Sequence, residues 1–294
     1  MSKPQWFAES VIRPVRVSYK ASRVLAELKT AYQQVVILEN ETFGRVLMLD
    51  GVVQTTTQDE FIYHEMLAHV PLYAHGSARD VLIVGGGDCG LAEEVLKHRA
   101  VQTVTQVELD PDVVELSRKY LSQINASVFL DRRFHLHYAD GATFVRDTEQ
   151  AFDVVLVDST DPVGAARALF TADFYRAAQR RLRPGGVLVC QAGVPFVQAN
   201  QFGSAMRHLA TAFRCVDSYL VSSPSYFGGH LAFSWASEDL KADCVDLETL
   251  AERHAASRIQ MRYYTPEVHR AAFVLPPYVA DMRDVAATIQ AGQH

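Results

Sequence analysis

A short apolar run without any polar residue, Val-Val-Leu-Val at positions 154–157, leaves few folds open to this chain. Such a run is typical of a strand covered on both faces, as in a parallel sheet. The run stops at Asp158, and a second carboxylate, Asp161, follows just before Pro162. Open α/β sheets bind ligands at the carboxyl ends of their strands. Taken alone, the two carboxylates fit either a substrate site or a pair of turn caps.

A second apolar run, at 81–84, ends in the glycine-rich segment 85–90, which we call the glycine turn. A helical pattern follows at 91–98, and a β-rich run at 101–107 ends on Glu108. Glycines let the backbone approach a ligand closely, and an acid after the next strand accepts hydrogen bonds from ribose hydroxyls. Strand, glycine turn, helix, strand and acid together predict a nucleoside-binding half.

Strands and helices alternate through the rest of the chain, which predicts an α/β fold. We expect helices at 112–121 and 172–182, strands at 134–138, 187–191, 215–221 and 231–235, and a turn at 183–186. This order indicates a Rossmann-like, methyltransferase-type, mostly parallel sheet with helices on both faces. Strand patterns at 34–39 and 45–49 predict a small antiparallel β domain before it. The expected domains are therefore 1–60, the N-terminal β domain, and 61–294, the catalytic domain.

The segment 58–69 has a helical spacing of apolar residues, with Phe61, Met66 and Leu67 on one stripe. Tyr63 and His64 fall outside that stripe. In such positions these residue types more often pack or face solvent than bind a ligand, so the segment alone does not assign them a function.

Charge and composition exclude several classes of function. The net charge is -6 and no cluster of Lys or Arg is present, so we expect no nucleic-acid partner and favour a cationic small molecule. The four cysteines lack C-x-x-C spacing, and His135 and His137 have no apparent third ligand, so no metal site is expected. The sequence has no signal segment and no membrane-spanning run, which predicts a cytoplasmic protein without a membrane partner.

Several motifs occur together and in order along nearly the whole chain. They lie at 50–54, 59–66, 85–88, 107–110, 140–141 and 158–162, with two late segments at 225–229 and 262–269. In this combination the chain resembles the polyamine aminopropyltransferase family, most closely its bacterial spermidine synthases. Ordinary methyltransferases of the same fold do not share the late segments.

The resemblance implies a set of site residues and partners. The donor would be decarboxylated S-adenosylmethionine, an adenosyl sulfonium, used as co-substrate without a further cofactor. Asp158 would be the proton acceptor, and a homodimer is implied. The donor would be held by Gln33, Gln54, Gly85, Gly86, Asp88, Glu108, Asp140, Gly141 and Ala165, and the acceptor by Tyr63, His64, Asp88, Asp158, Ser159, Thr160, Asp161 and Tyr226.

The chemistry explains these residue types. A diamine such as putrescine is a dication at neutral pH, because its amines should titrate near the lysine value of about 10.4, so an acid-lined slot suits it. One amine must lose a proton before it attacks the carbon beside the sulfonium, which requires a base. The expected reaction is a direct displacement that gives spermidine and methylthioadenosine.

Three alternatives remain open at this point. The acceptor could be cadaverine, agmatine or a triamine instead of putrescine. The chain could be an S-adenosylmethionine-dependent methyltransferase, although the acids would repel that donor's carboxylate. It could also be a paralog that binds polyamines without turnover.

Six residues depart from the family pattern. The family usually has Gly, Arg, Pro and Glu where this chain has Cys89, Glu93, Ala165 and Arg167, and Glu-Arg where it has Thr57-Gln58. Cys89 is expected to require an unusual backbone angle, and Ala165 removes a rigid ring from the loop over the adenine. The exchanged charges predict an ion pair between Glu93 and Arg167 that holds this loop shut. The competing interpretation is two solvated surface charges.

Overall fold

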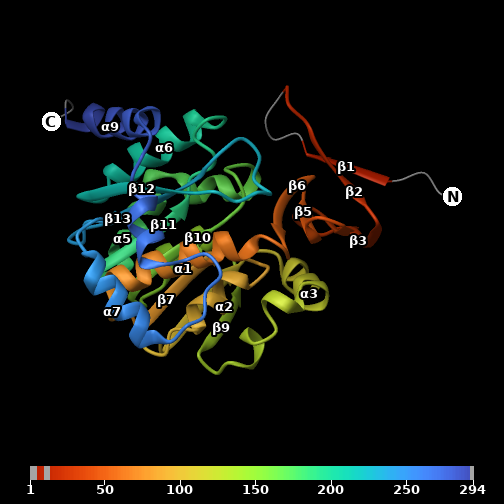
Figure 1. The fold of residues 1–294 in the computed structure, drawn as a ribbon, viewed down its shortest axis with the longest axis horizontal. Helices are drawn as coiled ribbons and strands as arrows, with labels where there is room; N and C mark the ends of the chain where they lie inside the picture. Colours follow the sequence, from red (N-terminus) through yellow and green to blue (C-terminus); the bar gives the residue numbers. More distant parts are fainter. Residues whose placement is uncertain (1–4, 10–13, 292–294) are drawn as a thin grey trace.

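Residues 5–9 and 14–291 are described by a computed structural model (Figure 1). The N-terminal part contains two antiparallel sheets. The first pairs β1 (Gln5–Glu9) with β2 (Val17–Ala21). The second has the order β3 (Arg23–Lys29), β4 (Gln34–Asn40), β5 (Gly44–Leu49) and β6 (Val52–Thr56). The predicted antiparallel β region is therefore present, with strands at both ends that the sequence pattern did not indicate.

A seven-stranded sheet forms the larger part of the molecule, in the order β12-β13-β11-β10-β7-β8-β9. Its strands are β7 (Asp80–Gly85), β8 (Thr103–Glu108), β9 (Phe134–Tyr138), β10 (Phe152–Asp158), β11 (Leu182–Gln191), β12 (Cys215–Val221) and β13 (Leu231–Ser237). The strands from β11 to β9 are parallel, whereas β13 is antiparallel to both β11 and β12. The predicted mostly parallel sheet is confirmed.

Helices cover both faces of this sheet (Figure 1). In β10, Val154 and Leu156 belong to a core shared with α1 (Glu60–His75) and α2 (Gly90–Leu96). Val155 and Val157 point to the other face, into a core shared with α4 (Gly141–Asp147) and α5 (Ala172–Arg181). Both faces of the strand are buried, which explains why its sequence shows no polar alternation.

The remaining helices flank these layers. They are α3 (Pro111–Tyr120), α6 (Ala199–Ala210), α7 (Leu247–Ser257), α8 (Pro266–Ala272), α9 (Pro277–Ala291) and the short 3-10 segments η1 (Ser122–Ile124), η2 (Val128–Leu130) and η3 (Gly164–Phe170). Among the described residues, no helix is both long and apolar enough to cross a bilayer.

Two local predictions were wrong. Helix α1 is buried on every side from Ile62 to Ala74, so the expected single apolar stripe does not describe it. It lies between the seven-stranded sheet and the helices α2 and α7, which leaves no solvent face and buries Tyr63 and His64. The turn expected at 183–186 lies inside β11, where the pairing with β10 shifts register, so the glycines form an irregularity in the strand.

Candidate active site

A cavity of about 500 Å³ lies where the carboxyl ends of β7, β8 and β10 face the N-terminal strands β5 and β6. All the residues assigned to a site on the sequence line it. These are Gln33, Gln54, Tyr63, His64, Gly85, Gly86, Asp88, Glu108, Asp140, Gly141, Asp158, Ser159, Thr160, Asp161, Ala165 and Tyr226. The cavity therefore joins residues that are far apart in the sequence.

The register of the sheet sets the position of Asp158. Asp158 pairs with Gly85 at the end of the parallel strands β10 and β7, and the amide of Gly86 donates a 2.7 Å hydrogen bond to the Asp158 carbonyl. Gly85 has a φ of 87°, and a Cβ on it would lie 2.2 Å from that carbonyl oxygen. Only glycine fits there, so the glycine turn and the end of β10 are locked together.

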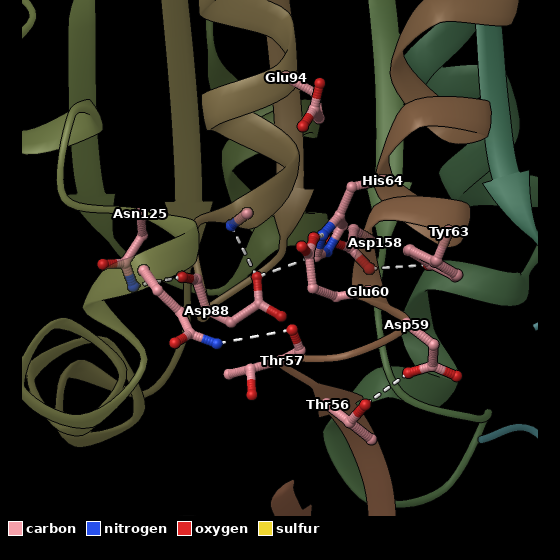
Figure 2. Close-up of polar contacts among 12 residues, drawn as sticks. Thr56, Thr57, Asp59, Glu60, Tyr63, His64, Asp88, Glu94, Asn125 and Asp158 are labelled. Atoms are coloured by element: carbon pink, nitrogen blue, oxygen red, sulfur yellow. Dashed lines mark hydrogen bonds and ion pairs between the residues drawn. The ribbon is translucent and has the colours of Figure 1, made fainter. Parts of the chain in front are cut away.

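Side chains from α1, the glycine turn and the end of β10 converge at this point (Figure 2). The Tyr63 hydroxyl from α1 donates a 2.8 Å hydrogen bond to the Asp158 carboxylate. His64 from the same helix has Nδ1 2.7 Å from Glu60 and Nε2 3.6 Å from Asp88. The carboxylate of Asp88 also accepts the amide of Gly90 at the start of α2. We call Glu60, His64, Asp88 and Asp158 the acid cluster.

The acid cluster shifts the protonation of its members. Burial raises the pKa of Asp158 to about 6, and the charge of Asp88 adds to this, while His64 and the Tyr63 hydroxyl lower it. Burial also works against a charge on His64, but Asp88 and Glu60 raise the pKa of that imidazole to about 10. At neutral pH the cluster therefore holds an imidazolium among three carboxylates, with an excess of negative charge.

His64, Asp88 and Asp158 could each offer a metal ligand, because one such atom from each lies within 4.8 Å of the others. A metal requires a neutral imidazole with a free lone pair. Here one ring nitrogen of His64 is paired with Glu60 and the other faces Asp88, and the raised pKa keeps both protonated. The donor set therefore suits an organic cation better than a metal ion.

The other half of the cavity contains the acid at the end of β8. Burial raises the pKa of Glu108 to about 7, against the backbone hydrogen bonds of Asp110 and Leu109 that lower it. Gln33 donates a 3.0 Å hydrogen bond to the carboxylate of Asp110. Asp140 accepts the amide of Thr143 and so caps α4 with one carboxylate oxygen.

Tyr226 lines the same part of the cavity as Tyr63 and Asp158. Its hydroxyl donates to the carbonyl of Gln54, and its ring centroid is 5.8 Å from that of Tyr63. The loop that carries it is tied to the start of α1, because buried Asp59 accepts the amide of Ser225 at 2.7 Å. One late segment, 225–226, is thereby joined to two early parts of the chain, Gln54 in β6 and Asp59 at the start of α1.

Sequence reasoning did not assign several polar residues of the cavity to the site, among them Glu9, Gln191 and Gln198. Burial raises the pKa of Glu9 to about 7, and one of its carboxylate oxygens is buried without a hydrogen-bond partner among the described residues. Glu9 belongs to the unpredicted strand β1, and Gln198 precedes the unpredicted helix α6. The sequence of β1 shows no alternation of apolar and polar residues. In α6, Phe202, Ala205, Met206 and Leu209 do have a helical spacing, but this spacing does not reveal that Gln198 reaches the cavity.

One departure from the family pattern has a visible effect on the backbone. Cys89 adopts the left-handed conformation with a φ of 62°, as expected for a residue at a glycine-like position.

The predicted ion pair between Glu93 and Arg167 was wrong. Glu93 is partly buried on α2, where burial raises its pKa, whereas Arg167 is exposed on η3 and pairs with no acid among the described residues. Glu93 therefore lies in a partly buried environment and Arg167 in solvent, and the two side chains do not meet.

Comparison with known proteins gives consistent matches. A family model described as the spermine/spermidine synthase domain matches residues 60–246, and one described as the spermidine synthase tetramerisation domain matches residues 5–57. Polyamine aminopropyltransferase of Ruegeria sp. (strain TM1040) is 48% identical over 279 residues, which is 95% of this chain and 98% of that relative. The enzyme of the same name from Pectobacterium carotovorum is 45% identical, covering 95% and 97%.

Solved structures agree with this. A spermidine synthase in complex with the transition state analogue AdoDATO superposes with a TM-score of 0.91 and 36% identity, over 96% of this chain and 97% of that one. Spermidine synthase from Thermotoga maritima gives a TM-score of 0.87 and 34% identity, over 96% of each chain.

Proposed function

The chain belongs to the spermine/spermidine synthase family and is a transferase, and from that premise we propose that it moves the aminopropyl group of decarboxylated S-adenosylmethionine to putrescine. The products would be spermidine and methylthioadenosine. The observation that carries the proposal is one cavity with a nucleoside-type half around Glu108 and an acid-lined half around Asp158 and Asp161.

In this proposal the donor lies along the ends of β7 and β8. Ionised Glu108 accepts hydrogen bonds from the ribose hydroxyls, with Gln33, Asp140, Gly141 and Ala165 around the nucleoside. Gly85 and Gly86 let the sulfonium side approach the backbone. Gln54 and Asp88 then take the aminopropyl amine of the donor.

The acceptor diamine occupies the acid-lined half. Asp161, with Ser159, Thr160 and the missed residue Glu9 nearby, faces the far ammonium. The Tyr63 and Tyr226 rings cover the methylene chain, and His64 keeps Asp88 in place. Asp158 removes the proton of the near amine, which frees the lone pair to attack the carbon next to sulfur.

The protein's contribution is alignment and one proton transfer. A sulfonium is already a good leaving group, so no cofactor is needed for the displacement. The step balances: the near ammonium loses one proton to Asp158, its nitrogen forms the new bond to carbon and becomes a secondary ammonium, and the carbon-sulfur bond breaks to leave a neutral thioether.

The decisive experiment incubates the purified protein with the donor and, separately, putrescine, cadaverine, agmatine and spermidine. Product amines and methylthioadenosine are followed by mass spectrometry. We expect aminopropyl transfer, with putrescine the best acceptor. Preference for another amine would correct the acceptor alone. Methyl transfer from S-adenosylmethionine without any aminopropyl product, or binding without turnover, would overturn the proposal.

We also propose the wider organisation of the protein. A domain boundary at residue 60 is supported by the start of α1 there. The match of residues 5–57 to a tetramerisation domain supports self-association. We keep a homodimer and a cytoplasmic location as proposals. Light scattering of the purified protein tests the stoichiometry, and a mass of one chain or of four chains would contradict the homodimer.

A further inference from the structure

Asp161 is held by two glutamine side chains that belong to a different part of the chain. Gln198, just before α6, donates a 2.8 Å hydrogen bond to one carboxylate oxygen. Gln201, in the first turn of α6, donates a 3.0 Å hydrogen bond to the other. Gln198 also donates to the Gln201 side-chain oxygen at 3.2 Å, so the three side chains form a closed ring. We call Gln198 and Gln201 the amide clamp.

The surrounding backbone is built to accommodate the amide clamp. The side-chain oxygen of Gln198 accepts the amide of Val194 at 2.8 Å, which fixes the orientation of its NH₂ group. Gly193 has a φ of 77°, and a Cβ on it would lie 2.7 Å from the Gln198 oxygen and 3.0 Å from the Gln201 nitrogen. A side chain at position 193 would therefore displace both amides.

The clamp acts at the end of the cavity that receives a cation. The carboxylate of Glu9, on β1, lies close enough to Asp161 for their charges to repel. Without a restraint, repulsion would drive Asp161 away from Glu9 and change the distance to Asp158. Two neutral donors hold the carboxylate in place, and each of its oxygens keeps a lone pair for an ammonium.

We propose that Gln198 and Gln201 are positioning residues that fix Asp161 relative to Asp158 and thereby select acceptor amines by chain length. The inference rests on the proposed aminopropyl transfer, whose specificity it explains. A diamine must bring one nitrogen to Asp158 while the other pairs with Asp161. When both carboxylates are fixed, a chain longer or shorter by one methylene is mismatched.

The test compares putrescine and cadaverine with the wild type, Gln198→Ala, Gln201→Ala and the double variant. Asn200 is exposed and lies in the first turn of α6 next to Gln201, so Asn200→Ala is the matched control. We expect the clamp variants to lose about tenfold in kcat/KM for the preferred diamine, mostly through a higher KM. The ratio of kcat/KM for the preferred diamine to kcat/KM for the other should fall by about three- to tenfold. Asn200→Ala should change neither kcat/KM for the preferred diamine nor this ratio.

A second variant separates positioning from simple loss of folding. Gly193→Ala leaves both glutamines in the chain but crowds them. It should therefore lower the ratio of kcat/KM for the two diamines, as the clamp variants do. The affinity for methylthioadenosine, measured by calorimetry, should stay within about twofold in every folded variant.

The proposal is overturned if the clamp variants keep the wild-type preference between diamines, or if kcat falls equally for both diamines with KM unchanged. These results differ from a failure of the proposed function itself. In that case the wild type would transfer no aminopropyl group to any amine, and no preference could be measured.

Discussion

The hydroxyl of Tyr63 donates a 2.8 Å hydrogen bond to the carboxylate of Asp158 and so joins the first turn of α1 to the end of β10. Tyr63 is buried and Asp158 half-buried, and the Tyr63 hydroxyl stays protonated because burial, with the charge of Asp158, raises its pKa. The phenol is thus a fixed donor that stabilises the ionised form of the proposed base.

Removal of this donor should make the base harder to ionise. A hydrogen bond to a charged group contributes roughly 1.5–3 kcal/mol, so Tyr63→Phe should raise the pKa of Asp158 from its value of about 6 toward and above neutrality. We expect about tenfold lower turnover at pH 7 and a smaller deficit at pH 8.5. A pH profile of kcat measures this, with exposed Tyr278→Phe as control. A deficit of the same size at both pH values would contradict the assignment.

Asp158→Asn should abolish proton transfer while preserving the shape of the site. Loss of a general base typically lowers turnover by about 10² or more, and methylthioadenosine binding should change little. In the wild type, kcat/KM for the acceptor should rise between pH 7 and 9, because the amine titrates near 10.4. A flat profile in that range would contradict the requirement for a deprotonated amine, and an active Asn variant would show that another group removes the proton.

The main elements of the fold could be predicted because they depend on local patterns. Val154 to Val157 form a strand buried on both faces, and that single fact predicts a parallel sheet, with a cavity at the carboxyl end where Asp158 lies. That the glycine turn and Glu108 line one cavity could likewise be predicted, because they end two strands that are adjacent in the chain and in the sheet.

Long-range packing could not be predicted in the same way. Glu9 reaches the cavity from an edge strand whose sequence shows no alternation, and Gln198 and Gln201 are ordinary polar residues until α6 brings them to Asp161. The proposed pair of Glu93 and Arg167 failed for the same reason. Proximity of strand ends does not determine where a side chain points, and Glu93 is held within α2 beside Lys97.

Gly90 provides space for the ring of His64, which leads to a third prediction. A Cβ on Gly90 would lie 2.4 Å from the imidazole Cε1, so Gly90→Ala should push His64 away from Glu60 and Asp88. We expect at least about tenfold lower kcat/KM for the acceptor, because the acid cluster loses its imidazolium. Steady-state kinetics and thermal unfolding measure the effect.

The matched control is Gly203→Ala in α6, where the added Cβ meets only the flexible end of Arg207 at 3.3 Å. Replacement of a helix-interior glycine by alanine favours the helix by up to about 1 kcal/mol, so this variant should stay active and fold at least as well as the wild type. Equal activity of the two variants would argue against a role for the position of His64.

Ionised Glu108 should lower the free energy of unfolding of the ligand-free protein. The pKa of this acid in the folded protein, about 7, lies above its ordinary value of 4.5, so the folded state holds the proton more tightly than the unfolded state does. Its contribution to stability is therefore present below pH 4.5 and is lost as pH rises through 7. Glu108→Gln should raise the free energy of unfolding of the ligand-free protein by about 1–3 kcal/mol at pH 8 and by little at pH 4.5. Urea unfolding at both pH values tests this, with exposed Glu115→Gln as control.

The same carboxylate predicts how nucleoside affinity depends on pH. Ribose hydroxyls donate hydrogen bonds, and an ionised carboxylate accepts them more strongly than a protonated one, so ligand binding must favour deprotonated Glu108. Because burial raises the pKa of Glu108 to about 7, methylthioadenosine should bind several-fold more tightly at pH 8 than at pH 6. Calorimetry should also detect release of a fraction of a proton on binding at pH 7. Glu108→Gln should weaken binding at pH 8 by about tenfold or more and remove the dependence on pH. If the Gln variant kept the wild-type pH dependence, the titrating group would be a different one, and Glu108 would not be the ribose acceptor.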